Sequence, residues 1–302
     1  MPTDARLLVD CRCTLGEGIV WSRHLRSLLW TDIEKSTLWM HDPGDGRSRQ
    51  WSLPDRLGSF ALCESGRLLL GLAKSLAFAD LGAATGSVLQ IDPIMPIEPH
   101  MARTRINDGR TDRSGNFVFG TFNEAQDAPT GSFYQYSSRS GLRRLDLGGI
   151  VIPNSICFSL DGSRMYFCDS PTGQIRQCDY DADTARVTNV REFVRFKEGS
   201  GLPDGSVIDS QGCLWNAVWG AGVVRRYDPD GRLLTEIPVP SRNLTCVVFG
   251  GDALDQLFVT SSRQELTDEE LSAAPVSGGV FSVQTASRGV TDALFKDSIN
   301  DQ

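Results

Sequence analysis

The stretch Asn154-Ser-Ile-Cys-Phe158, with the turn Asp161-Gly162 and then Arg164-Met-Tyr-Phe-Cys-Asp169, contains the unit that decides the fold. Two short apolar strands are joined there by a tight turn. Gly173-Gln-Ile-Arg-Gln-Cys-Asp179 follows with the polar and apolar alternation of a half-exposed strand. Residues 186–193 supply a fourth, outer strand. Four short strands in succession predict one antiparallel sheet.

The same unit recurs along the whole chain. Its paired apolar strands are found again at 18–21 with 28–32, 60–63 with 67–71, 107–109 with 116–121, 206–209 with 213–217, and 245–249 with 256–260. Six copies of about 50 residues are typical of a β-propeller. We therefore predict an all-β fold, a six-bladed β-propeller with four-stranded antiparallel blades around a central channel, and one domain over residues 1–302. Residues 6–12 are expected to complete the last blade beside 279–283. A pair of β-sandwiches is the structural alternative.

Composition narrows the class of protein. The 302 residues are 40% apolar and 23% charged, which excludes global disorder, and 30 Gly with 14 Pro leave little room for long helices. A net charge of −8 without any basic run argues against a nucleic-acid partner. No apolar stretch approaches the ~20 residues of a membrane span, and the first residues lack the apolar core of a signal peptide. We expect a cytoplasmic protein without a membrane partner, and its oligomeric state is not indicated.

The eight cysteines are scattered and mostly lie inside apolar runs, without a Cys-x-x-Cys pair. We expect reduced, buried thiols in place of metal ligands or disulfides. The three histidines, His24, His41 and His100, fall on a turn, an alternating strand and an inter-blade loop. They are expected to be exposed or structural residues.

One position in each blade is expected to face the mouth of the channel. Asn107, Asn154 and Asp204 each precede a turn glycine by eight residues, and matching of the apolar strands puts Glu17, Gly58 or Ser59, and Thr245 at the same place. Taken singly, Glu17, Asn154 and Asp204 could be ordinary turn residues. Their shared register favours a common site. Carboxylate and amide oxygens gathered without a Lys or Arg in that set suit a divalent cation such as Ca²⁺, Mg²⁺ or Mn²⁺, and zinc also accepts carboxylate.

These blocks together resemble the gluconolactonase/regucalcin-like (senescence marker protein) family of six-bladed propellers. The resemblance runs from Leu15-Gly-Glu-Gly-Ile-Val-Trp21 through Arg105-Ile-Asn-Asp-Gly109 and Ile152-Pro-Asn-Ser155 to Gly201-Leu-Pro-Asp-Gly205. It implies one divalent metal, Ca²⁺, Zn²⁺, Mn²⁺, Mg²⁺ or Fe²⁺. The implied metal ligands are Glu17, Asn154 and Asp204, and the implied contacts to a sugar lactone are Arg105 and Asn107. A glutamate after the family's Gly-Thr block also binds substrate, which makes Glu124 a candidate.

The resemblance implies metal-dependent hydrolysis of a sugar-acid lactone to the aldonic acid. Residues 122–134 are most like members that act on pentonolactones, such as L-arabinono- or xylonolactone. The metal would polarise the carbonyl and activate a water, and Asp204 would take its proton as general base. Arg105 and Asn107 would orient the sugar, while the loops at 123–132 and 264–277 would set specificity. No Gly-x-Ser-x-Gly elbow occurs, which disfavours a serine hydrolase. A non-catalytic Ca²⁺-binding or interaction propeller and a metal-dependent esterase or phosphotriesterase are the alternatives.

Overall fold

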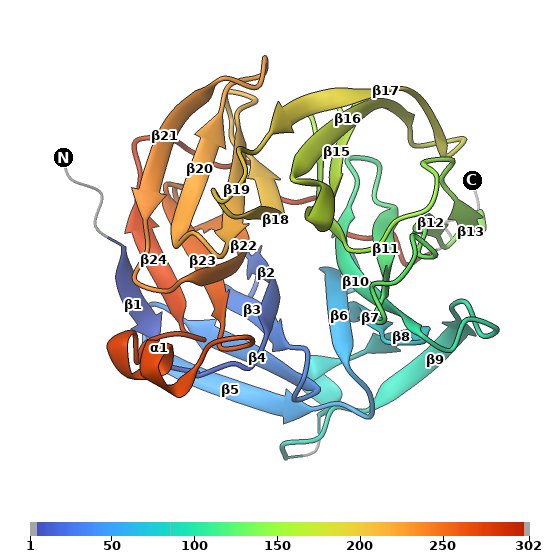
Figure 1. Cartoon of the computed structure of the whole chain (residues 1–302). Coiled ribbons are helices and arrows are strands. Elements are labelled where there is room, and N and C mark those ends of the chain that lie inside the picture. The colour runs from blue at the N-terminus through green and yellow to red at the C-terminus, as the bar shows by residue number, and fades with distance from the viewer. Residues whose placement is uncertain (1–4, 85, 299–302) are drawn as a thin grey trace.

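The β-propeller predicted from the sequence is confirmed. The computed structural model describes residues 5–84 and 86–298, and in them the strands form six four-stranded antiparallel sheets. The sheets stand as blades around a common axis (Figure 1). The predicted domain ends, residues 1 and 302, lie outside the described residues.

In the first five blades the four strands lie side by side in the order in which they follow along the chain. Blade one holds β2 (Gly16–Ser22), β3 (Ser27–Asp32), β4 (Thr37–Asp42) and β5 (Arg47–Ser52); blade two holds β6 (Leu57–Leu62), β7 (Leu68–Leu72), β8 (Ser75–Ala79) and β9 (Ile91–Pro96). Blade three holds β10 (Thr104–Thr111), β11 (Phe117–Asn123), β12 (Phe133–Ser137) and β13 (Gly141–Arg144); blade four holds β14 (Pro153–Phe158), β15 (Arg164–Asp169), β16 (Gln174–Asp181) and β17 (Arg186–Arg195). Blade five holds β18 (Leu202–Ile208), β19 (Leu214–Trp219), β20 (Val223–Tyr227) and β21 (Leu233–Pro238).

The last blade joins the two ends of the chain. It holds β22 (Asn243–Gly250), β23 (Gln256–Ser262) and β24 (Val280–Gln284), with β1 (Arg6–Val9) as its outer strand. Leu7 pairs with Phe281 in this antiparallel register. The predicted seam is therefore confirmed, and it closes the ring with backbone hydrogen bonds.

The hydrophobic core lies between the blades. Because successive side chains of a strand point to opposite faces, each blade presents apolar residues to both of its neighbours. Each of the six clusters of buried side chains in the described residues joins two adjacent blades. Phe133 of blade three meets Phe167 of blade four edge to face at 5.3 Å, and Trp215 of blade five meets Phe249 of blade six at 5.5 Å. Each blade therefore buries its apolar faces against its neighbours.

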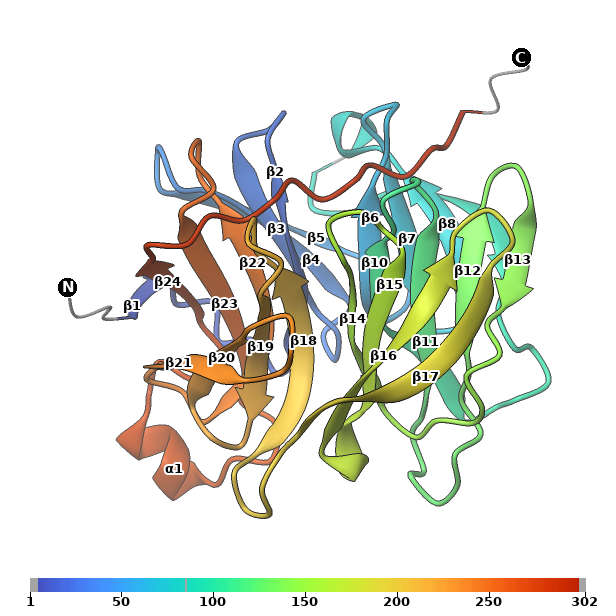
Figure 2. The same cartoon turned by 90° about the horizontal axis from the view of Figure 1, so that it is seen from above.

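Different segments lie at the two ends of the channel axis (Figure 2). Near the start of β2 lies α1 (Asp268–Ala273), which begins with a capping box between Thr267 and Glu270. The segment 264–277, expected as a loop, therefore contains a helix. At the opposite end the C-terminal segment crosses the ring, where Ser210 N donates to Arg288 O at 2.7 Å and Phe295 N donates to Leu62 O at 2.8 Å. The remaining short helices are η1 (Leu81–Ala83) and η2 (Ser170–Thr172).

All eight cysteines are free thiols, and seven of them are buried as expected; Cys11 is half-buried. Burial raises the pKa of the Cys63 and Cys157 thiols to about 12, which leaves them inert at neutral pH. None of the helices in the described parts of the chain has the length and apolarity needed to cross a membrane.

Candidate active site

The predicted site residues lie on the innermost strand of each blade, at a β-bulge that the blades share. In all six described blades, the pairing of the first strand with the second shifts register at the predicted position or one residue before it, as between Glu17 and Val20, Asn154 and Cys157, and Pro203 and Ser206. A bulge redirects a side chain that a regular ladder would send into the blade interface. Ser155, directly after Asn154, has φ 59°, a strained value for a residue other than glycine. The spacing to the turn glycines marks these positions in the sequence; the bulge orients them.

Three carboxylates meet near the axis, from Glu17 on β2, Asp108 on β10 and Asp204 on β18. Asp204 is 5% exposed, and its Oδ1 atom is buried with no hydrogen-bond partner among the described residues. Removal from water, then the charges of Glu17 and Asp108, raise the pKa of Asp204 well above its usual value. Loss of water, then the charge of Asp108, raises the pKa of Glu17 to about 8. Without a positive charge beside them, the three carboxyl groups therefore resist being ionised together near neutral pH.

A chain of hydrogen bonds links blades three and four beside these acids. The Arg105 guanidinium donates to Asn107 Oδ1 at 2.7 Å, and Asn107 Nδ2 donates to Asn154 Oδ1 at 3.0 Å and to Pro153 O at 3.0 Å. Asn154 Nδ2 donates in turn to Ser170 Oγ at 2.9 Å. These bonds fix both amides, so that Asn154 directs its oxygen, not its nitrogen, toward Asn107.

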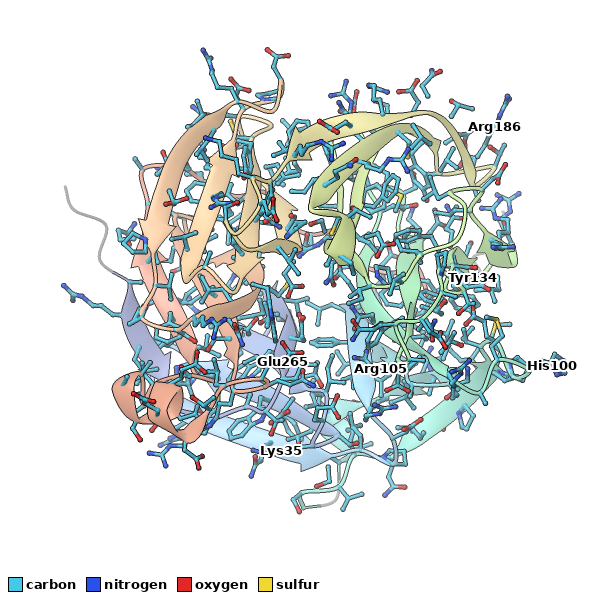
Figure 3. All side chains as sticks on the ribbon, in the orientation of Figure 1. Lys35, His100, Arg105, Tyr134, Arg186 and Glu265 are labelled. Carbon is cyan, nitrogen blue, oxygen red and sulfur yellow. The ribbon has the colours of Figure 1, made fainter. Side chains whose placement is uncertain are left out.

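Arg105 is a buried cation of the site. Figure 3 shows it beside the axis, whereas His100 lies at the outer rim. Burial, then the nearby charge of Arg56, lowers the pKa of Arg105 to about 10, which still leaves it charged at neutral pH. Its Nε atom is buried without a hydrogen-bond partner in the described residues, and its guanidinium carbon lies 4.7 Å from the centroid of the Phe122 ring. Both hydrogen bonds that Arg105 donates within the described residues come from one terminal nitrogen, so its other terminal nitrogen is free for a bound molecule.

Glu124, on the segment after β11, also belongs to this mouth. Its Oε1 atom lies 3.6 Å from Arg105 Nε and 2.6 Å from a guanidinium nitrogen of Arg56. The hydrogen bond from Arg56, above all, holds the pKa of Glu124 below its usual value. The structure thus brings together the six residues predicted from the sequence: Glu17, Arg105, Asn107, Glu124, Asn154 and Asp204.

The donor set fits a hard divalent cation. Glu17 and Asp204 supply carboxylate oxygens and Asn154 an amide oxygen, and the unpartnered Oδ1 of Asp204 lies where a positive charge would relieve the repulsion. In residues 5–84 and 86–298, no group of three or more His, Cys, Asp or Glu side chains is placed to hold a metal by itself. His41 is buried away from this donor set, with Nδ1 2.9 Å from Ser48 Oγ.

Two other residues at the matched position lack a comparable role. The Thr245 hydroxyl lies 2.5 Å from Gly16 O and 2.8 Å from the Thr260 hydroxyl, so it joins blade six to blade one. Ser59 Oγ is buried without a partner among the described residues. Among the described residues, neither hydroxyl has a hydrogen bond with a histidine, as the argument against a serine nucleophile expects.

Two residues of this site, Asp108 and Arg56, were not predicted from the sequence. Asp108 follows Asn107 directly, and because the bulge turns both residues inward, its Oδ2 accepts from Ile156 N at 2.8 Å near Glu17 and Asp204. The only sign of Asp108 in the sequence is its place directly after Asn107 in the run Asn107-Asp-Gly109. Arg56 lies two residues before Gly58 in the segment that enters β6, and nothing in its local sequence distinguishes it from a surface arginine.

A six-bladed propeller with an acidic, arginine-bearing site at one mouth defines the class of this protein. The chain matches the family model described as SMP-30/Gluconolactonase/LRE-like region over residues 15–263, and it belongs to that family. L-arabinolactonase of Azospirillum brasilense is 44% identical over 96% of this chain and 95% of its own, and 6-deoxy-6-sulfogluconolactonase of Pseudomonas putida is 35% identical over 93% and 94%. The crystal structure of regucalcin from Agrobacterium tumefaciens, described as a calcium-binding protein, has a TM-score of 0.90 at 30% identity and covers 98% of both chains.

Proposed function

We propose that this protein hydrolyses a sugar-acid lactone to the aldonic acid, and that its substrate is a pentonolactone such as L-arabinono- or xylonolactone. The names of the two lactonase relatives support lactone hydrolysis. The name of the relative that is 44% identical, L-arabinolactonase, supports a pentose lactone as the substrate. The observation that carries the proposal is an acidic group, buried Asp204 with half-buried Glu17 and Asp108, that lies beside the donors of the buried Arg105 at one mouth. Such a site can both activate water and polarise an ester.

Glu17, Asn154 and Asp204 are the residues that would hold one divalent cation. When bound, such a cation supplies Lewis acidity toward a carbonyl oxygen. Oxygen donors are compatible with Ca²⁺, Mg²⁺, Mn²⁺, Zn²⁺ and Fe²⁺. Asp204 must be ionised to accept a proton, and its pKa, raised by burial, falls when a positive charge lies beside it.

Asp204 acts as general base and then as general acid. It takes one proton from the attacking water while the water oxygen bonds to the carbonyl carbon of the lactone. The bond between that carbon and the ring oxygen then breaks. The proton held on Asp204 passes to the ring oxygen, which becomes a hydroxyl of the aldonic acid, and the carboxylate is restored.

Arg105 and Asn107 position the sugar for this attack. Arg105 is fixed by its bond to Asn107, and Asn107 is fixed by Asn154 and Pro153, so the free donor of Arg105 has a defined direction before substrate enters. Preorganised donors in a site with little water cost no reorganisation during the reaction.

A pH-indicator assay tests the proposal with pentono- and hexonolactones. The chelated protein is expected to be inactive and to regain hydrolysis when one of the five cations is added, with the pentonolactones turned over most efficiently. Absence of hydrolysis with every lactone and cation would contradict the lactonase proposal. Full activity after exhaustive chelation would contradict the cation. Cation binding without any hydrolysis would favour a calcium-binding propeller.

A further inference from the structure

Arg56 forms a bidentate ion pair at the same mouth. Its two terminal nitrogens donate to Glu124 Oε1 at 2.6 Å and Oε2 at 3.1 Å, and Glu34 Oε2 lies 3.9 Å away. The three side chains come from three blades: Glu34 from the β3–β4 turn, Arg56 from the segment before β6, and Glu124 from the segment after β11. They remain about one-third exposed, at 31%, 30% and 34%, so a molecule entering the mouth can contact them.

The pair offers both donors and acceptors beyond those it uses. A guanidinium has five N–H groups, and two of those of Arg56 go to Glu124, which leaves three without an acceptor in the described residues. Glu124 accepts one of these bonds on each oxygen, so each oxygen has a further lone pair. The 3.6 Å contact from Glu124 to Arg105 Nε connects the pair to the residues placed around the reacting ester.

A role in stability alone explains little of this arrangement. Exposed ion pairs contribute on average only about 0–1 kcal/mol to folding and are weakened by salt. Blades two and three already share a cluster of buried side chains that includes Ile106 and Phe117, and the backbone of Ile106 donates to Ala73 O at 3.0 Å. The blades do not need a charged tether at the mouth.

We propose that Arg56 determines substrate specificity: together with Glu124 it binds hydroxyl groups of the sugar lactone away from the carbonyl. Arg56 donates to one hydroxyl oxygen, and Glu124 accepts from a neighbouring hydroxyl. Two adjacent hydroxyls need a donor and an acceptor side by side, and a bidentate arginine–carboxylate pair supplies both in a rigid geometry. This inference rests on the proposed lactonase function.

The test compares two substrates of one ring type, a pentono-1,4-lactone and γ-butyrolactone, which has the same ring without hydroxyls. In Arg56→Ala, kcat/KM for the pentonolactone is expected to fall at least about tenfold, mainly through KM, because a hydrogen bond to a charged group is lost. The value for γ-butyrolactone is expected to stay within twofold. Arg56→Lys keeps the charge but loses the bidentate geometry, and should restore the pentonolactone value only in part.

Arg103→Ala is the matched control. Arg103 pairs with Asp127 at 3.0 Å on the same rim, but both side chains are mostly exposed. It should leave both substrates unchanged. If wild type turns over γ-butyrolactone too slowly, its inhibition constant against the pentonolactone supplies the same comparison.

Equal losses on both substrates in Arg56→Ala, or no loss on either, would overturn the inference. A wild-type protein that hydrolyses no lactone would instead refute the proposed function. Calorimetric binding of the pentonolactone to wild type and Arg56→Ala would then test Arg56 by itself, with equal affinities counting against it.

Discussion

Replacing Asp204 by Asn should remove activity and at the same time stabilise the cation-free protein. The substitution keeps the shape of the side chain but removes a buried ionisable group from a cluster of three carboxyl groups, and Oδ1 of Asp204 has no hydrogen-bond partner to lose. Burial of an acid whose pKa is raised costs about 1.4 kcal/mol for each pH unit above its ordinary pKa, so a cost of about 1–3 kcal/mol is expected near neutral pH. We expect a gain of that size in the free energy of unfolding after chelation, which corresponds to a rise in Tm of several degrees at about 2–4 °C per kcal/mol. Loss of a general base costs about 10²–10⁴-fold in rate.

Thermal unfolding after chelation and the lactone assay with added cation measure the two effects. Asp230→Asn is the matched control, because Pro229-Asp-Gly231 repeats the tripeptide Pro203-Asp-Gly205 in an exposed turn. The control should change neither quantity. A lower Tm of cation-free Asp204→Asn would refute the reasoning on buried charge. Activity within twofold of wild type would refute the role of Asp204 as base.

Three further outcomes are expected. Calcium at 100 times its dissociation constant should stabilise the chelated protein by about 2.7 kcal/mol, and Glu17→Gln should lose most of this gain at the same concentration; an equal gain would exclude Glu17 as a ligand. Asp292→Ala should lower the free energy of unfolding, measured in urea, by about 3 kcal/mol, because Arg110, only 10% exposed, loses its carboxylate partner at 2.8 Å. The control Asp252→Ala, at the exposed pair with Arg26, should lower it by less than about 1 kcal/mol. Burial lowers the pKa of His41, so the unfolded chain binds this proton first, and stability should fall as pH drops below about 6.5. His41→Gln should flatten that part of the pH profile, and an unchanged profile would contradict the assignment.

The local sequence was sufficient for the blades. Alternation of polar and apolar residues specifies the short strands. The glycines at 115, 162 and 212, which all have positive φ, specify the tight turns. Each blade is built from such strands and turns within about 50 residues of the chain. These interactions are local in the chain, so their pattern can be read directly. The capping box at Thr267 was equally local, and it marks a helix within a segment expected to be a loop.

The site was predictable where the repeat extends to it. Glu17, Asn107, Asn154 and Asp204 share one position in the unit, and the ring then brings that position to one mouth. The tripeptide Pro-Asp-Gly alone decides nothing, because Asp204 is buried at the axis and Asp230 is exposed in a turn. Arg56 and Glu124 lie outside the repeated position, so their pairing depends on how two blades are placed side by side.

The amino-acid sequence by itself determined the number of blades and the order of most of their strands, because both depend on contacts between neighbours in the chain. Only the tertiary structure decided the charges of the site. The meeting of three carboxyl groups, one buried and two half-buried, and the Arg56–Glu124 pair each join residues from different blades. The C-terminal segment does the same at the far mouth. Electrostatic interactions depend on distance and on exclusion of water, and both are set only when the ring closes.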